Sequence, residues 1–457
     1  MTQDRTRNPG LYFTSALLPD GWACNVRLEI ARGRIVAVER DAAPADADER
    51  AAIGLPGVGN LHSHAFQRAM AGLTERRGQE EDSFWTWRTL MYRFATQMTP
   101  DDVEAVAAQA YVEMLEAGFT RVGEFHYIHH APDGRPYDNI AEMAARIAAA
   151  ADISGIGLTL LPVFYAHSGF GGALPAPEQA RFLNDPDRYG RLIQDSRAAI
   201  ADLKDAIVGI APHSLRAVTP EELTAILPLA GEGPIHIHVA EQMKEVADCR
   251  EWSTKRPVEW LLDAMPLDRR WCLVHATHMN ADEIERLAAS GAVAGLCPIT
   301  EANLGDGIFP AVDFQSAGGS FGIGSDSNVR IDPAEELRLL EYGQRLAGRA
   351  RNVLAAGTER STGRTLFDTA VRGGAQALGV EPGLRVGATA DIISLNADHP
   401  ALAARGGDDL LDSFIFAGAP VSGVWCAGRK LVSDGVHHRR AAVAGRFRQV
   451  LERLRGA

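Results

Sequence analysis

The chain has 457 residues, too many for one ordinary hydrophobic core, so we expect one large domain and one smaller domain. Its hydrophobic content of 46% lies in the globular range and excludes a disordered chain. The formal net charge of −13 argues against nucleic acid or an anionic membrane as a partner, and a small anionic substrate would need local arginines.

The N-terminal sequence and the cysteines predict a cytoplasmic protein. No apolar signal region follows Met1, and we find no run of about 18 apolar residues. The 5 cysteines are scattered along the chain without Cys-x-x-Cys spacing. This pattern is typical of reduced thiols, so we expect neither a disulfide framework nor a zinc knuckle.

The first part of the chain predicts short strands, and a different pattern follows. Residues 28–30 and 34–38 flank a short turn, which is a hairpin signal. From residue 55 onward, short apolar runs alternate with longer helical stretches, which indicates repeated β-α units and a parallel sheet. About eight runs occur, the number that closes a (β/α)8 barrel. They are residues 55–64, 120–125, 157–163, 207–211, 235–239, 271–275, 293–297 and 320–324.

The last part of the chain turns helical and then returns to strands. We expect helices over residues 334–350, 365–378 and 441–454, and strands over 391–395, 421–425 and 430–432. The predicted fold is therefore α/β: a TIM-like (β/α)8 barrel with a small β-sandwich domain built from both chain ends. The expected division is 1–54 and 384–457 for the small domain and 55–383 for the catalytic barrel.

Polar side chains recur at the carboxyl ends of the predicted strands, where barrels carry their active sites. His62 and His64 end the first run and share one strand face, so they can hold one metal ion together. His238 ends the fifth run, His275 the sixth, and Asp326 follows the eighth. One such histidine is more often a hydrogen-bonded core residue, but several at the strand ends of one barrel indicate a shared metal site.

This layout resembles the amidohydrolase superfamily. The matching segments are residues 61–64, 238–241 and 325–326, together with His275, and the resemblance covers nearly the whole chain. In that superfamily, the corresponding histidines and aspartate bind a metal. The metal ligands that the resemblance implies are His62, His64, His238 and Asp326.

The fourth predicted strand bears on the number of metal ions. Binuclear members of the superfamily carry a lysine there, which becomes a carbamate bridge. Here the strand continues into residues 211–216, and the nearest lysine, Lys204, precedes it. We expect one metal ion per chain, Zn²⁺ in the first place, with Fe²⁺ as the alternative.

The ligand set predicts a hydrolytic reaction at an sp² carbon. A divalent ion with an open position lowers the pKa of its water towards about 7. The leaving amine needs a proton, and Glu241, three residues after His238, is placed to carry it. The alternative for Glu241 is a carboxylate at a helix start. His275 is placed to orient or deprotonate the water, and Asp326 to accept a proton as well as to bind metal.

Within the superfamily, the chain is similar to the deaminase and chlorohydrolase branch, and it resembles the N-formimino-L-glutamate deiminases of histidine degradation. Residues 59–68, 83–88, 123–127 and 212–216 carry that resemblance. The implied reaction is hydrolysis of N-formimino-L-glutamate to N-formyl-L-glutamate and ammonia by a homodimer. The implied substrate contacts are Gln67, Arg88, Tyr127, His213 and Arg216.

A glutamate derivative has two carboxylates, and arginine is the residue that binds a carboxylate in bidentate fashion. Arg88 follows the first predicted strand and Arg216 the fourth, so both should open at the catalytic face. The alternatives are a solvated surface charge for either residue, or stacking of Arg88 on the aromatic rings beside it.

Three hypotheses are alternatives to a deiminase: two other enzymes and one protein without enzymatic activity. A guanine-type purine deaminase would need aromatic stacking and little positive charge in the pocket, and a triazine-type chlorohydrolase would release halide. A metal-free scaffold would have lost ligands, whereas every expected ligand is present. His236, deeper on the face of His238, is interpreted as structural. No role is assigned to His126, His129, His130 and His278.

Overall fold

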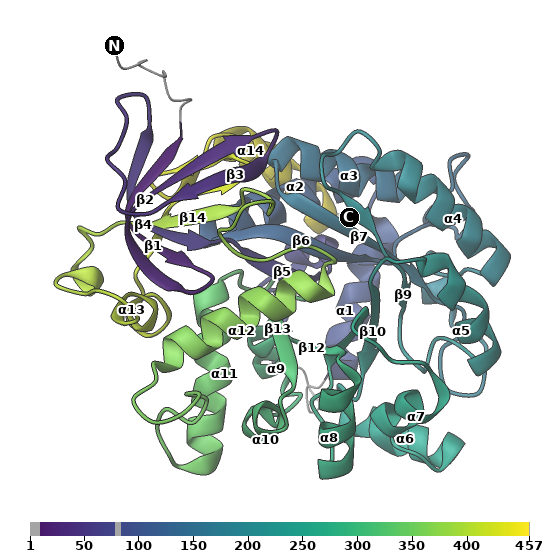
Figure 1. Ribbon diagram of the computed structural model, residues 1–457. Helices are drawn as coiled ribbons and strands as arrows, with labels where there is room; N and C mark the ends of the chain where they lie inside the picture. Colours follow the sequence, from purple (N-terminus) through teal and green to yellow (C-terminus); the bar gives the residue numbers. More distant parts are fainter. Residues whose placement is uncertain (1–9, 78–83, 457) are drawn as a thin grey trace.

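The computed structural model describes residues 10–77 and 84–456 as a barrel with a small sheet beside it (Figure 1). In this part of the chain, neighbouring barrel strands pair in parallel and in chain order, and the last pairs with the first. The ring closes through parallel bridges from Ile210 to Ile235 and from Ser214 to His238. The predicted (β/α)8 barrel is confirmed. Its strands are β5 (Val58–Ser63), β6 (Phe119–His126), β7 (Gly157–Phe164), β8 (Ile207–Val208), β9 (Ala211–Pro212), β10 (Ile235–Val239), β11 (Trp271–His275), β12 (Val293–Leu296) and β13 (Ser320–Ile323).

The fourth barrel strand differs from the prediction because it is divided. The run 207–211 was expected as one strand, but it forms β8 and then β9, and both pair with β7. Residues 209 and 210 separate the two pieces: the N–H of Gly209 still bonds to Leu160 O on β7, whereas the N–H of Ile210 bonds to Pro234 O, just before β10. The second piece, β9, ends at Pro212. The polar segment that follows, residues 213–216, therefore leaves the barrel at its carboxyl end and reaches the candidate site.

Helices cover the outside of the barrel (Figure 1). The longest of those that wrap the first half, α2, starts with a capping box between Thr99 and Asp102 and ends at Gly118, whose φ of 105° is left-handed. None of the helices in the described ranges combines the length and apolar character that crossing a membrane requires. The helices are α1 (Phe84–Gln97), α2 (Pro100–Ala117), α3 (Glu142–Ser154), α4 (Pro186–Ala199), α5 (Pro220–Ile226), α6 (Met243–Ser253), α7 (Pro257–Ala264), α8 (Ala281–Ser290), α9 (Pro298–Leu304), α10 (Ala311–Ser316), α11 (Pro333–Gly348), α12 (Thr362–Ala377), α13 (Asp409–Ala417) and α14 (Arg440–Gly456).

Both chain ends meet in one mixed sheet, as expected, and its described strands follow one continuous order instead of forming two separate sheets. That order is β17-β16-β15-β14-β4-β1-β2-β3. The predicted hairpin is present, with a turn at Arg32 and Gly33 where φ is 53° and 83°. The strands are β1 (Leu11–Leu18), β2 (Gly21–Ala31), β3 (Arg34–Glu39), β4 (Glu49–Pro56), β14 (Ile392–Leu395), β15 (Val421–Cys426), β16 (Arg429–Ser433) and β17 (Val436–His437).

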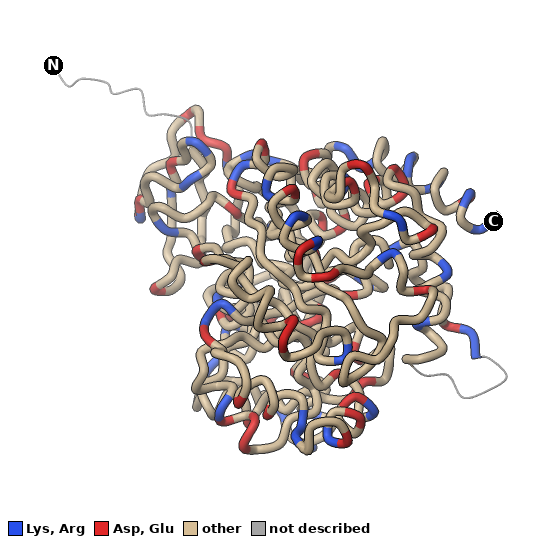
Figure 2. Tube along the Cα trace, turned by 90° about the vertical axis from the view of Figure 1, so that its right-hand side faces the viewer, with Lys and Arg blue, Asp and Glu red and all other residues tan. Residues whose placement is uncertain are grey.

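The predicted terminal helix is α14, and it lies against α2 (Figure 1). Arg446 and Arg453 on α14 form ion pairs with Glu104 and Asp102 on α2. In the view of Figure 2, acidic and basic residues are intermixed over the helices and loops of both parts. The net charge of −13 is therefore spread over the molecule in this view and does not mark one face as a binding surface.

A buried ion pair holds the start of the described chain against the small sheet. The guanidinium of Arg27, fully buried, donates from Nε to Asp48 at 2.9 Å, and Asp48 also accepts the backbone N–H groups of Gly10 and Ala45. Burial alone would raise the pKa of Asp48, but the bonds from Arg27 and from the two backbone groups lower it overall.

Replacing Asp48 with asparagine is expected to reduce the free energy of unfolding by about 3 kcal/mol at neutral pH, because Arg27 stays buried with a weaker partner. Since folding lowers the pKa of Asp48, its contribution is present above the unfolded value of about 3.9 and is lost as the pH falls through the folded value. Urea unfolding at several pH values should therefore show the difference shrinking in acid.

The matched control is Asp20→Asn, at an exposed ion pair with Arg40. This variant should unfold almost as the native chain does, because exposed ion pairs contribute little. Equal destabilisation by the two substitutions would contradict the role given to the buried pair.

Candidate metal centre and active site

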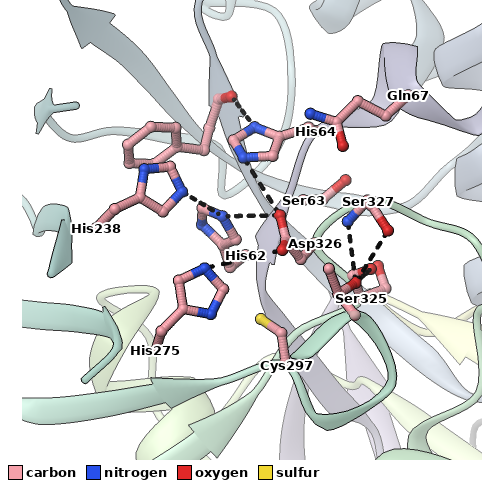
Figure 3. A network of polar contacts seen from close by, with 12 residues as sticks. His62, Ser63, His64, Gln67, His238, His275, Cys297, Ser325, Asp326 and Ser327 are labelled. Atoms are coloured by element: carbon pink, nitrogen blue, oxygen red, sulfur yellow. Dashed lines mark hydrogen bonds and ion pairs between the residues drawn. The ribbon is translucent and has the colours of Figure 1, made fainter. Parts of the chain in front are cut away.

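Four side chains from three barrel strands converge at the carboxyl end of the barrel (Figure 3). His62 and His64 come from the end of β5, His238 from β10, and Asp326 from the turn after β13. The Nε2 atoms of His62 and His238 are 3.0 Å apart, and Asp326 Oδ1 lies 3.4 Å from His62 Nε2 and 3.3 Å from His64 Nε2. All four ligand atoms lie within 4.8 Å of one another, and all four residues are buried.

The hydrogen bonds and pKa values of these histidines fit a metal ligand set. A carbonyl oxygen only accepts, so His64 Nδ1 donates to Phe125 O at 2.9 Å and His238 Nδ1 donates to His213 O at 3.0 Å. Each Nε2 then keeps its lone pair directed at the cluster. Burial lowers the pKa of His62 to about 3 and also lowers the pKa values of His64 and His238. Neutral imidazoles facing a carboxylate suit a divalent ion.

A polar network that the sequence did not reveal holds Asp326 in place. Asn60 on β5 accepts the backbone N–H of Ser325 and donates to its hydroxyl. Asn328 accepts from that hydroxyl and donates to the backbone carbonyls of His64 and Asp326. Asp326 itself has a left-handed φ of 43°. Such strain is maintained where surrounding contacts fix the backbone, and here it aims the carboxylate at the histidines.

His275 and Glu241 lie beside the metal cluster. His275 Nε2 is 3.8 Å from Glu241 Oε1 and 3.9 Å from Asp326 Oδ2, and its Nδ1 is 3.2 Å from Glu301 Oε1. Burial raises the pKa of Glu241 to about 7. Burial by itself would lower the pKa of His275, but the carboxylates of Glu241, Glu301 and Asp326 outweigh it and raise the pKa to about 10.

Glu241 does not serve as the helix-start carboxylate that was its alternative reading. The helix α6 begins at Met243, and Glu245 accepts the backbone N–H groups of Ala240 and Glu241 instead. The side chain of Glu241 is therefore left to face the cavity, where it is 6% exposed.

A cavity with about 570 Å³ of empty space opens over the metal cluster. It brings together every catalytic and substrate-binding candidate from the sequence, and it adds aromatic residues that the sequence analysis did not select. Gln67 donates to the hydroxyl of Tyr127 at 3.0 Å. The candidates that line it are Gln67, Arg88, Tyr127, His213, Arg216, Glu241, His275 and Asp326, and the added residues include Tyr92, Tyr165 and Phe182.

Two arginines line this cavity without a carboxylate partner within 4.0 Å among the described residues. Arg216 is buried, at 9% exposure, and its Nε has no hydrogen-bond partner in that part of the chain. Arg88 lies on α1, with its guanidinium carbon 4.6 Å from the centre of the Trp85 ring. The stacking alternative for Arg88 therefore holds, and the residue also faces the cavity as the sequence predicted. Ser83, which begins the segment 83–88, lies outside the described residues.

Four further histidines bond to backbone carbonyl oxygens and are not part of the metal cluster. His236 donates from Nε2 to Ala377 O at 2.7 Å, which agrees with its structural interpretation. The corresponding acceptors are Val163 O for His129, Leu183 O for His130 and Asp306 O for His278, while His126 is buried beside His129.

Comparisons with known proteins agree with this geometry. The profile of the amidohydrolase family matches residues 53–431, and that of "Formimidoylglutamate deiminase HutF, N-terminal domain" matches residues 12–52. The formimidoylglutamate deiminase of Pseudomonas aeruginosa is 52% identical over 97% of this chain and 99% of its own length.

Solved structures have the same fold. An amidohydrolase from Brucella melitensis is 57% identical, with a TM-score of 0.95 over 98% of this chain and 100% of that one. An adenosine deaminase from Xanthomonas campestris with bound zinc is 22% identical, with a TM-score of 0.80 over 98% of this chain and 99% of that one, and it shares the fold. The chain belongs to the amidohydrolase family and, within it, to the formimidoylglutamate deiminases.

Proposed function

We propose that this chain hydrolyses N-formimino-L-glutamate to N-formyl-L-glutamate and ammonia. The observation that carries the proposal is one cavity that contains both the metal cluster and two arginines with no carboxylate partner in the described residues. A buried guanidinium is stable when a carboxylate pairs with it, and a glutamate derivative supplies two carboxylates. The identity of 52% to a formimidoylglutamate deiminase supports the same substrate.

We propose that the cavity holds one Zn²⁺ ion on His62, His64, His238 and Asp326. A second set of possible ligands, His275, Cys297 and Asp326, also lies within 4.8 Å. Carboxylates raise the pKa of His275 to about 10, which disfavours the neutral ring that a second ion would need. The absence of a lysine at the end of β9 also favours a single ion.

When bound, zinc supplies Lewis-acid activation of water near neutral pH. Residues of the chain then transfer the protons and stabilise the negative charge that develops. Glu241 accepts the first proton that the attacking water loses and passes it to the leaving nitrogen. Asp326 Oδ2 accepts the second proton, from the hydroxyl of the tetrahedral adduct, and this proton also reaches the nitrogen, which departs as ammonia as the C=O bond forms. A pKa of about 7 lets Glu241 exist in both forms at neutral pH. His275 donates from Nε2 to the attacking oxygen as negative charge develops on it.

Substrate orientation is assigned to residues farther up the cavity. We propose that Arg88 and Arg216 bind the two carboxylates, while Gln67, Tyr127 and His213 contact the rest of the substrate. Gln67 and Tyr127 are already joined by a hydrogen bond, which fixes them relative to His64 below. Holding both carboxylates would place the amidine carbon near Glu241 and the metal ligands.

Replacing His238 with alanine is expected to weaken zinc binding by more than about 100-fold. Loss of a residue that only hydrogen-bonds to a metal ligand lowers metal affinity by up to about 100-fold, and loss of the ligand itself should lower it further. Metal analysis after passage over a chelating resin measures this directly. The native chain should retain one zinc ion per chain. Two tightly bound ions, or full zinc retention by the variant, would contradict the assigned site.

The control for that experiment is His236→Asn, two residues earlier on the same strand. His236 bonds to a backbone carbonyl and is not one of the four ligands, so this variant should retain zinc.

The substrate assignment can be tested against the two rival enzymes. Ammonia release should be rapid with N-formimino-L-glutamate and absent with guanine, and no halide should be released from a chlorotriazine. Turnover of guanine in preference to the amidine would replace the proposal with a purine deaminase.

We also propose that the domains divide as the sequence suggested, at about residues 54 and 384. The division is supported by β4, which pairs within the small sheet, and by β14, where the chain rejoins that sheet. The homodimer, the cytoplasmic location and Fe²⁺ as an alternative metal stay predictions.

A further inference from the structure

A buried carboxylate that the proposed reaction has not used lies behind His275. Glu301 sits on α9, just after β12, and is 4% exposed. Its Oε1 atom accepts two hydrogen bonds, from Nδ1 of His275 at 3.2 Å and from the backbone N–H of Cys297 at 2.9 Å. One oxygen therefore connects the start of α9 to the histidine at the end of β11.

This contact determines which nitrogen of the His275 ring points into the cavity. Because a carboxylate at neutral pH only accepts, Nδ1 must carry a proton, whether the ring is neutral or charged. Nε2 is then directed away from Glu301 into the cavity, where it lies 3.8 Å from Glu241 and 3.9 Å from Asp326. A ring turned over by rotation about its last side-chain bond would lose the bond to Glu301.

The backbone alone does not fix this ring. His275 ends its strand with a left-handed φ of 68°, and Ala276 follows with 48°, so the chain turns sharply at the catalytic position. In this geometry the side-chain orientation depends on contacts of the ring itself. Among the described residues, the contact that holds the ring through its Nδ1 is the hydrogen bond that it donates to Glu301 Oε1 at 3.2 Å.

We propose that Glu301 is a positioning residue for the hydrolysis: it holds the His275 ring with Nε2 aimed at the attacking oxygen. The inference rests on the proposed deiminase function and adds a residue that acts through His275 without touching substrate. A carboxylate that fixes the far nitrogen of an active-site histidine sets both its orientation and its tautomer.

A purely structural role for Glu301 makes different predictions. Its carboxylate also accepts the backbone N–H at the start of α9, and its own N–H donates to Cys297 O as part of that helix. If this were all, substitutions would change stability and metal content, but they would not change kcat in a folded, zinc-loaded enzyme. Measuring kcat and KM separately therefore distinguishes the two roles.

The test compares Glu301→Leu with Glu301→Gln in zinc-loaded enzyme. Leucine removes the acceptor, so kcat for N-formimino-L-glutamate should fall by about 100-fold with KM close to native. Glutamine keeps an oxygen at the same place, because the N–H of Cys297 requires an acceptor there. This conservative variant should therefore recover most of the lost kcat. An unchanged kcat in a folded Glu301→Leu enzyme would overturn the proposal.

A double-variant cycle tests whether Glu301 acts through His275. In a His275→Asn background, Glu301→Leu should cause no further loss of kcat, because the ring that it positions is gone. An equal loss in both backgrounds would also overturn the proposal. The native enzyme serves as the control for function: if it does not release ammonia from N-formimino-L-glutamate, the proposed function fails, whereas activity that survives Glu301→Leu refutes only this inference.

Discussion

Replacing Glu241 with glutamine is expected to lower kcat for N-formimino-L-glutamate by about 1000-fold, with zinc content and KM close to native. The amide has nearly the same shape as the carboxyl group, so it leaves the cavity intact. It cannot take a proton from water and deliver it to the departing nitrogen. Steady-state ammonia release, combined with metal analysis of the same preparation, measures the effect.

The geometry explains why this residue should have so large an effect. Glu241 is 6% exposed, and burial raises its pKa to about 7, so both protonation states are available at neutral pH. Glu245 takes over the hydrogen bonds to the backbone N–H groups of Ala240 and Glu241. The matched control is Glu251→Gln on the exposed side of α6, the helix that follows Glu241, and it should leave kcat unchanged. A Glu241→Gln enzyme with native kcat would contradict the proton-transfer role.

The metal cluster could be predicted from the sequence because each ligand ends a strand of a regular alternating pattern. Two histidines at a spacing of two share a strand face, and parallel strands bring their carboxyl ends to one rim. The same logic correctly separated His238 from His236, which lies deeper and bonds to Ala377 O. The pattern placed these residues and His275 at one rim, and the resemblance to the amidohydrolase superfamily distinguished the four metal ligands from His275.

The supporting residues could not be predicted in this way, because their partners are far apart in the sequence. Asn60 and Asn328 hold opposite ends of one network, and contacts of this kind join residues 265 positions apart. Glu301 reaches His275 from the next strand along the barrel, with no repeating interval to indicate the pair. Asn60 is a polar residue in a largely apolar run, which is a signal that the sequence offered, whereas Asn328 lies in the polar segment 325–328 and does not stand out.

The environment of Arg88 was predicted in part. The aromatic residues beside it indicated an enclosed position, and it does stack on Trp85. Periodicity alone, however, does not show that Arg88 on α1 and Arg216 after β9 line the same cavity. The packing of α1 brings the two arginines to one cavity, and a single sequence does not reveal such tertiary packing.

Replacing Arg216 with methionine is expected to raise KM for N-formimino-L-glutamate by about 100-fold, with a smaller change in kcat. The loss of one partner from a buried, charged hydrogen-bonded pair costs about 2–5 kcal/mol. The carboxylate is held equally in the ground state and the transition state, so most of that cost should appear in KM. Methionine preserves much of the side-chain volume and removes the charge. An unchanged KM would rule out Arg216 as a carboxylate clamp.

Substrate analogues show which carboxylate Arg216 binds. N-formimino-4-aminobutyrate lacks the α-carboxylate, and N-formimino-L-glutamine lacks the charge on the side-chain carboxylate. If Arg216 binds the α-carboxylate, native enzyme and Arg216→Met should use the first analogue equally well but differ on the second. Arg88→Met should give the opposite pattern, because the two guanidiniums line one cavity and the substrate has one carboxylate for each. If both variants lost affinity equally for both analogues, the arginines would set the general positive charge of the cavity and would not bind individual carboxylates.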